Sequence, residues 1–245
     1  MSARRTAATA VRVLRQLRRD PRTIGLLLLV PVGLMTLLRF VFDADPATFD
    51  RVGGPLIGLF PFITMFVVTS ITMLRERTSG TLERLMAMPM AKLDLLLGYG
   101  IAFAAVAAVQ ALVVSAVAFL LLGLDVEGSP AVVVALAIGN AVLGMSLGLF
   151  VSAFAATEFQ AVQFMPAFVL PQLLLCGLFV PRDEMAPLLE AVSWALPLTY
   201  AFDALDRVTT GGSLGARGAV DVVVIVGATL GALALGATTL RRRTA

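Results

Sequence analysis

The chain has 245 residues, of which 59% are hydrophobic and 14% charged, with a formal net charge of +3 and a mean hydropathy of +0.94. Soluble domains carry about 25% charged residues, so this chain cannot supply the surface of a soluble protein, and we predict an all-α integral membrane protein. The absence of His and the single Cys exclude His-based metal sites, Ser-His or Cys-His catalysis and an intrachain disulfide.

Residues 1–22 are basic and come before the first long apolar run. Val11, Leu14 and Leu17 fall at helical spacing, with arginines on a different face. This pattern predicts an amphipathic helix on the inner membrane surface; a disordered basic tail is the alternative. We expect no cleavage as a signal peptide, because the apolar run that follows is long and no A-x-A-like site follows it cleanly.

Six apolar runs are each long enough to cross about 30 Å of hydrocarbon at about 1.5 Å per residue. They lack the alternation of strands, and backbone groups in lipid must pair internally, so we predict six transmembrane helices in one domain covering residues 1–245. The predicted spans are residues 23–42, 53–74, 95–122, 131–156, 162–180 and 218–240.

Three pairs of glycines at G-x-x-x-G spacing lie within these runs. Such pairs let helices approach closely, either within one chain or between two copies, and the spacing alone does not decide between the two. The pairs are Gly54 and Gly58, Gly144 and Gly148, and Gly227 and Gly231.

The distribution of basic residues predicts the orientation. With six spans, fourteen of the nineteen Lys and Arg residues fall on the side of the two termini and five on the other side. The positive-inside rule therefore predicts a multi-pass protein of the bacterial plasma (inner) membrane with both termini in the cytoplasm. Because this topology explains the pI of about 9.7, we expect no nucleic-acid partner.

Residues 75–94 form a compact charged loop on the cytoplasmic side, between the second and third spans. Ser79-Gly80 predicts a turn, and residues 81–86 are suited to a short helix that ends before Pro89. The apolar face of such a helix has no cover within its own loop. It would lie on the membrane or enter a groove on a partner, and the residues alone favour neither.

Residues 181–217 lie on the outer side in this topology. Their first half carries leucines and a valine at the spacing of one apolar helix face, and Pro197 ends that helix. Asp203 and Arg207 are spaced to pair at i, i+4 on a second short helix.

Three segments together resemble the ABC type-2 transporter permeases of the daunorubicin-resistance-like export group. The loop R-E-R-T-S-G-T-L-E-R-L at 75–85, followed by Met88-Pro89, is similar to the cytoplasmic loop of that family. The segment P-L-T-Y-A-F-D-A-L at 197–205 is similar to the stretch before its last span. T-E-F-Q-A-V-Q-F-M-P at 157–166 fits the entry to its fifth span.

The resemblance implies two permeases, identical or related, paired among membrane lipids above two separate ATP-binding-cassette ATPase subunits. ATP and Mg²⁺ would be bound by those subunits, and we expect this chain to hold no cofactor and not to be an enzyme. In agreement, its one lysine, Lys92, is not preceded by the Gly of a Walker A loop.

The resemblance also implies that the 75–94 loop holds a coupling helix that docks on the ATPase. A solvated loop that only anchors the topology is the alternative. The coupling residues would be Arg75, Glu76, Gly80, Thr81, Leu82, Glu83, Arg84, Leu85 and Pro89.

Two further sets of residues follow from the same resemblance and from the spans. Short re-entrant helices near a substrate exit would carry Trp194, Pro197, Leu198, Thr199, Tyr200 and Asp203, with Trp194 and Tyr200 alternatively serving as interfacial anchors. A lateral path for substrate would be lined by Phe60, Phe66, Gln163, Phe164 and Phe168, unless these residues serve packing only.

The function expected from the sequence is outward transport of a hydrophobic or amphipathic substrate, such as a drug, lipid or glycolipid, driven by the partner ATPase. A channel or secondary transporter is one alternative, although no charged residue is expected near the centre of a span to carry ion coupling. A membrane anchor of a complex is the other alternative, although it does not require both the charged loop and the outer segment.

Overall fold

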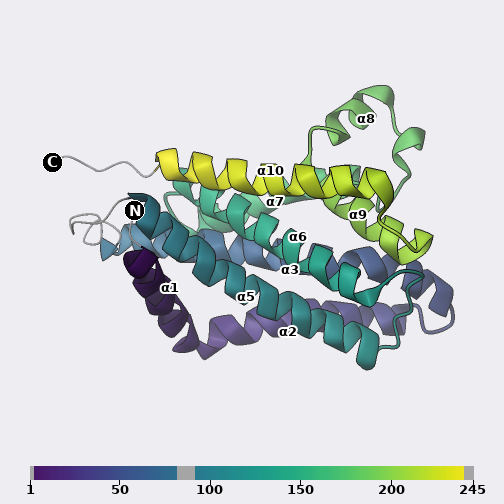
Figure 1. The fold of residues 1–245 in the computed structure, drawn as a ribbon, viewed down its shortest axis with the longest axis horizontal. Helices are drawn as coiled ribbons and strands as arrows, with labels where there is room; N and C mark the ends of the chain where they lie inside the picture. Colours follow the sequence, from purple (N-terminus) through teal and green to yellow (C-terminus); the bar gives the residue numbers. More distant parts are fainter. Residues whose placement is uncertain (1–2, 82–91, 240–245) are drawn as a thin grey trace.

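The computed structural model describes residues 3–81 and 92–239, and within these ranges the regular secondary structure is entirely helical, as predicted. The long helices run side by side along one axis, with α3 and α6 in the middle of the bundle (Figure 1). The helices are α1 (Ala3–Arg18), α2 (Pro21–Val41), α3 (Pro46–Thr78), α5 (Lys92–Leu120), α6 (Pro130–Val151), α7 (Glu158–Leu175), α8 (Pro187–Ser193), α9 (Pro197–Gly211) and α10 (Gly215–Thr239), with short 3-10 turns at Ser152–Phe154 and Arg182–Glu184.

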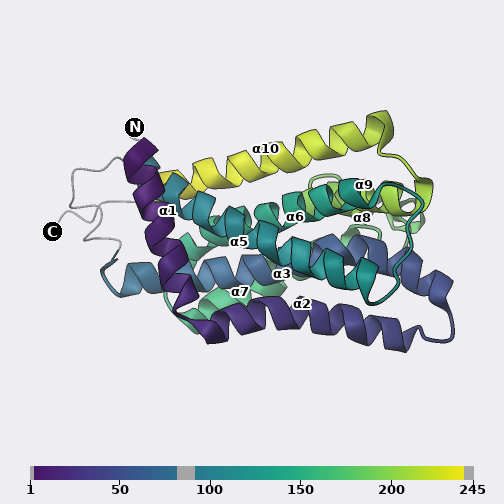
Figure 2. The same cartoon turned by 60° about the horizontal axis from the view of Figure 1, so that its bottom comes forward.

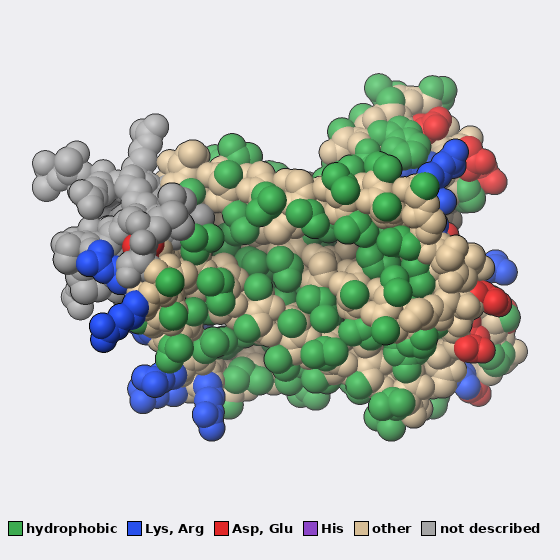
Figure 3. Space-filling view, in the orientation of Figure 1, with side chains coloured by type: hydrophobic (Ala, Val, Ile, Leu, Met, Phe, Trp, Pro, Cys, Tyr) green, Lys and Arg blue, Asp and Glu red, His purple; other side chains and the backbone are tan. Residues whose placement is uncertain are grey.

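The two ends of the bundle differ in what they hold. Both termini lie at one end, called here the terminal end, where α1 crosses the bundle steeply (Figure 2). Helices α8 and α9 lie at the other end, called here the distal end (Figure 1). Charged side chains gather at the two ends, and the surface between them is mainly apolar (Figure 3). This is the pattern of a bundle that crosses a membrane along its long axis.

Among the described residues, five helices are long and apolar enough to cross a membrane: α2, α3, α5, α6 and α10. The run predicted at 162–180 corresponds to α7, which has 18 residues and is less apolar, because it contains one Glu, three Gln and two Pro. Helix α7 ends at Leu175, ahead of Gly177 with a φ of +105°, so the predicted end at residue 180 is wrong. The sixth crossing stays a prediction.

Two other predicted boundaries also need correction. The run predicted to begin at residue 53 belongs to a helix that begins at Pro46, because the Asp45 carboxylate accepts a hydrogen bond from the Thr48 N–H at 3.2 Å and Pro46 occupies the first turn. The run predicted to end at residue 156 leaves the α-helix after Val151 and continues as one 3-10 turn. Apolar content marks the part of a helix that lies in lipid, whereas caps set where the helix ends.

Two of the three G-x-x-x-G pairs serve packing within the chain. A Cβ added at Gly144 or Gly148 of α6 would lie closer than 3.0 Å to the backbone carbonyl of Phe62 or Phe66 of α3. Gly54 and Gly58 of α3 receive Thr209 and Leu205 of α9 in the same way. A Cβ at Gly227 or Gly231 of α10 would meet nothing within 4 Å among the described residues.

A proline inside α2 explains the most deeply placed glutamine of the bundle. Pro31 has no N–H, so the carbonyl of Leu27 one turn earlier has no partner within its own helix. The fully buried amide of Gln110, from α5, donates to that carbonyl at 2.7 Å and also donates to the Thr64 hydroxyl of α3. One side chain therefore joins α2 to the core at the point where Pro31 interrupts the helix.

We expect Gln110→Leu to lower the free energy of unfolding by about 1 kcal/mol, within the range for a single interhelical hydrogen bond in a membrane. In a Pro31→Ala background the new N–H of residue 31 satisfies Leu27, so the same substitution should cost less. The four variants of this cycle are compared by thermal unfolding in detergent. If Gln110→Leu lowers the free energy of unfolding equally in both backgrounds, Gln110 does not compensate for the hydrogen bond that Pro31 cannot donate to Leu27.

Candidate functional site

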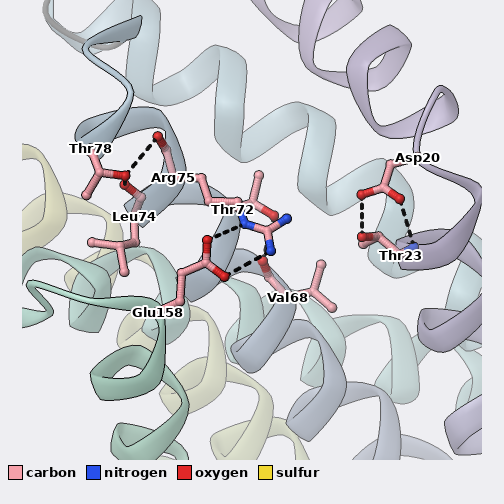
Figure 4. A network of polar contacts seen from close by, with 8 residues as sticks. All are labelled: Asp20, Thr23, Val68, Thr72, Leu74, Arg75, Thr78 and Glu158. Carbon is pink, nitrogen blue, oxygen red and sulfur yellow. Dashed lines mark hydrogen bonds and ion pairs between the residues drawn. The ribbon is translucent and has the colours of Figure 1, made fainter.

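The last turn of α3 leads directly into the 75–94 loop and is held from several sides. Arg75 donates from Nε and Nη2 to the two carboxylate oxygens of Glu158, at 2.8 and 2.9 Å (Figure 4). Glu158 begins α7, so this bidentate pair ties the end of α3 to the start of α7. The hydrogen bonds from Arg75 lower the pKa of the Glu158 carboxyl, so the carboxyl stays ionised at neutral pH.

Glu76 points to a different part of the bundle. Its side chain is only 3% exposed, and its carboxylate lies 3.7 Å from Nη1 of Arg12 in α1. The same guanidinium donates to the hydroxyl of Tyr99 in α5 and lies 5.5 Å from the centre of its ring. Tyr99 is fully buried. Glu76 and Arg12 therefore join α3, α1 and α5 through one partly buried cluster, which we call the Glu76 cluster (Glu76, Arg12 and Tyr99).

Arg77 completes the set by donating to the backbone carbonyl of Ser152, at 3.4 Å, in the 3-10 turn after α6. Three consecutive residues thus contact α7, α1 with α5, and the end of α6. The sequence named Arg75 and Glu76 as coupling residues, but it did not name Arg77, Arg12, Tyr99 or Glu158 as their partners. Because these partners are far away along the chain, no local spacing indicates them.

The predicted turn after this set is confirmed. Helix α3 ends at Thr78, the Ser79 N–H donates to the carbonyl of Arg75 at 2.9 Å, and Gly80 has a φ of +70°. The left-handed conformation at Gly80 favours glycine and redirects the chain. Thr81 is the last residue described before residue 92, and its hydroxyl lies 3.0 Å from that of Ser79. The remaining predicted coupling residues, Leu82, Glu83, Arg84, Leu85 and Pro89, lie outside the described residues.

This arrangement is suited to transmitting movement. Through these contacts the last turn of α3, which leads into the loop, is connected to α7, to α1 and α5, and to the end of α6. Charge-assisted hydrogen bonds with fixed geometry are stiffer links than apolar contacts, which permit sliding. No described group of three or more His, Cys, Asp or Glu residues is arranged to hold a metal ion.

At the distal end, three of the six predicted exit residues, Trp194, Tyr200 and Asp203, lie in one cluster. The Trp194 ring stacks on the guanidinium of Arg182, 4.3 Å from ring centre to Cζ, and Arg182 donates to the Asp203 carboxylate at 2.5 Å. The Tyr200 hydroxyl donates to the carbonyl of Trp194 at 2.7 Å. The sequence analysis did not name Arg182, whose guanidinium lies between the Trp194 ring and the Asp203 carboxylate.

The remaining exit residues have structural positions in α9. Pro197 occupies the first turn, and Leu198 and Thr199 are fully buried. The Thr199 hydroxyl donates to the carbonyl of Ser193 at 2.7 Å, which holds α8 against α9.

The predicted pair of Asp203 with Arg207 is wrong. Asp203 pairs with Arg182, and Arg207 lies 3.5 Å from Asp221 of α10. An i, i+4 spacing makes a pair possible on an isolated helix, but a buried carboxylate takes the partner that packing brings closest. Both ion pairs connect α9 to neighbouring segments, so the distal end is held together across elements.

The residues proposed for a substrate path do not share one surface. Phe66 of α3 is buried in the core of the bundle, and Phe60 of the same helix is half-buried. Gln163 and Phe168 lie on the exposed face of α7, and Phe164 packs edge-to-face against Phe168 with ring centres 6.2 Å apart. Of this set, the residues of α7 are the ones that a molecule moving along the outside of the bundle would meet.

Comparison with known proteins adds a family match and several curated relatives. The sequence profile described as ABC-2 type transporter matches residues 5–208. The probable multidrug ABC transporter permease YbhR of Escherichia coli is 29% identical over 151 residues, which are 60% of this chain and 40% of that protein. The inner membrane transport permease YhhJ of Escherichia coli is 29% identical over 177 residues, 69% of this chain and 45% of that protein.

A eukaryotic relative shows the same kind of partial match. ABC transporter G family member 20 of Dictyostelium discoideum is 26% identical over 156 residues, 64% of this chain and 21% of that protein. The matched part of the chain therefore spans less than half the length of each of these relatives.

Proposed function

Because the chain belongs to the ABC-2 type transporter family, we propose that it is the membrane-spanning permease subunit of an ATP-binding-cassette exporter. ATP hydrolysis takes place on a separate ATPase subunit, present in two copies, which binds the ATP and Mg²⁺. A second permease, identical or related, completes the membrane part. The relatives named as ABC transporter permeases support this proposal.

The observation that carries the proposal is the anchoring of the 75–94 loop. Its first residues are bound to four other segments of the bundle through Arg75, the Glu76 cluster and Arg77. A loop that only anchored topology would need positive charge but no such set of directed contacts. When the ATPase docks on the loop, these contacts pass the closure of the ATPase to several helices at once.

The proposed orientation places the terminal end in the cytoplasm and the distal end outside. Arginines predominate at the terminal end, as the positive-inside rule requires (Figure 3). With both termini at one end, α7 supplies the sixth crossing along with the five apolar helices. Helices α8 and α9 then form the outer re-entrant segment, with Trp194 and Tyr200 at the outer boundary.

The substrate class that fits best is hydrophobic or amphipathic: a drug, a lipid or a glycolipid. Exposed apolar side chains cover α2 and α7, including Leu29 at 71%, Leu37 at 62%, Phe159 at 72% and Leu174 at 58% exposure. Such surfaces contact lipid, and a substrate that partitions into the bilayer can approach along them. The word multidrug in the name of one relative is in keeping with this class.

The test is co-purification in mild detergent with the candidate ATPase, followed by measurement of ATP hydrolysis. We expect the amount of ATPase that co-purifies with the double variant E83A/L85D to be at least about tenfold lower than with the native chain. A tenfold loss corresponds to about 1.4 kcal/mol of binding free energy. The matched control L188D/E190A makes the same two changes on α8 at the distal end, where Leu188 is 75% exposed, and should retain the ATPase.

The other outcomes are equally informative. If E83A/L85D is folded and holds the ATPase as well as the native chain, the loop is a topology anchor and the coupling assignment is wrong. If the native chain itself binds no ATPase, the exporter assignment is wrong.

A further inference from the structure

Helix α1 has a surface from which the proposed coupling uses only Arg12. The helix contains five arginines and no acidic residue. Its inward face, with Thr9, Ala10 and Val13, is buried against α5, where a Cβ added at Gly98 would lie closer than 3.0 Å to Thr9. This close contact fixes the helix, and Figure 2 shows α1 on the outside of the bundle at the terminal end.

An open hollow of about 710 Å³ lies along one of these other faces. Three arginines, at i, i+3 and i+7, form a stripe along it, and small side chains at the N-terminal part of the helix leave room beside them. Among the described residues that line it there is no carboxylate. Those residues are Ala7, Ala8, Val11, Arg12, Arg15, Gln16 and Arg19.

The hollow lies at the boundary between the apolar surface and the charged end. Val11 and Leu14 of α1 are 44% and 36% exposed, so apolar groups lie beside the arginines. Helix α2 follows directly and exposes Leu26 at 64% and Leu29 at 71%, within about two turns of its start. In a membrane, phosphate groups occupy the layer just outside the acyl chains.

From these observations we propose that the α1 hollow binds the phosphate-bearing headgroup of an anionic phospholipid in the leaflet at the terminal end. Guanidinium groups match phosphate geometry with paired hydrogen bonds, and Arg15 and Arg19 are both exposed and available for such contacts. The neighbouring Val11 and Leu14 contact the upper part of the acyl chains. An acidic protein surface would match the arginines but would not account for these exposed apolar side chains.

Arg12 connects this site with the coupling loop. It lines the hollow, and the same guanidinium lies 3.7 Å from Glu76 and donates to Tyr99. A phosphate in the hollow competes with Glu76 for Arg12 and thereby changes the electrostatics at one of the first residues of the 75–94 loop. Anionic lipid at this site therefore acts on the end of α3 as well as holding α1 to the membrane.

The test measures lipid binding to the purified chain in mild detergent by native mass spectrometry. Dioleoyl phosphatidylglycerol and dioleoyl phosphatidylcholine share the same acyl chains and differ in headgroup charge. We expect the first phosphatidylglycerol to bind at least tenfold more tightly than the first phosphatidylcholine. The variant R15Q/R19Q should lose this preference, whereas R4Q/R18Q, which removes the same charge from exposed positions of α1 outside the hollow, should keep it.

Three results would overturn the proposal, provided that the variants keep the native thermal midpoint. Equal binding of the two lipids by the native chain would show that there is no headgroup site. Equal loss in R4Q/R18Q and R15Q/R19Q would show that only the overall charge of α1 matters. If R15Q/R19Q keeps the lipid preference but no longer retains the ATPase, the hollow is a protein contact. Because the lipid measurement needs no ATPase, its outcome is independent of the exporter proposal.

Discussion

Replacing both Gly144 and Gly148 with alanine is expected to lower the free energy of unfolding by about 2–6 kcal/mol, from about 1–3 kcal/mol for each overpacked position. A Cβ at either site would lie closer than 3.0 Å to a backbone carbonyl of α3, at Phe62 or Phe66. Backbone atoms cannot rotate away as a side chain can, so α3 and α6 must separate. These two helices form the centre of the bundle, and their separation loosens the packing of Leu59, Phe62 and Phe66.

The matched control is the double alanine variant of Gly227 and Gly231, which has the same spacing and the same change in volume. A Cβ at either of these positions meets nothing within 4 Å among the described residues, so the monomer should keep its midpoint or gain slightly from the higher helix propensity of alanine. Thermal unfolding in detergent compares the two variants. Equal thermal midpoints for the two variants would show that the close contact of α3 with α6 at Gly144 and Gly148 does not contribute to the stability of the bundle.

The sequence predicted the helices well, because apolar content in lipid leaves helix as the choice for a long run. The helix ends were harder to predict. Asp45 and Pro46 begin α3 well before the apolar part starts, and the polar and proline content of α7 keeps it out of the five helices that are apolar enough to cross a membrane. Hydropathy reports where lipid contacts the chain, whereas caps, turns and prolines determine where the helix begins and ends.

The candidate site was predictable to a smaller extent. Similarity to a family loop named Arg75 and Glu76, but their partners Glu158 and Arg12 come from other parts of the chain. At the distal end, the expected local pair on α9 was replaced by contacts from Asp203 to Arg182 and from α9 to α10. Spacing along one helix determines which residues share a face, but it carries no information on which other helix packs against that face.

Removing Arg12 is expected to have the second large effect. Arg12→Ala leaves the carboxylate of Glu76, only 3% exposed, without its cation. Breaking a buried ion pair in this way costs about 3–5 kcal/mol, and we expect about 3 kcal/mol here because the Arg12 side chain is 33% exposed. The loss should appear as a lower midpoint of thermal unfolding in detergent, and as weaker stimulation of the ATPase in the reconstituted complex.

The double variant R12A/E76Q separates charge from packing. With Glu76 replaced by the neutral, similarly sized Gln, the loss of Arg12 no longer strands a charge, so the double variant should be more stable than Arg12→Ala alone. If it is instead less stable by the sum of the two single effects, Arg12 and Glu76 act independently. A stable double variant that still fails to stimulate the ATPase would show that the charged link between α1 and α3, beyond the packing around it, transmits the movement of the loop.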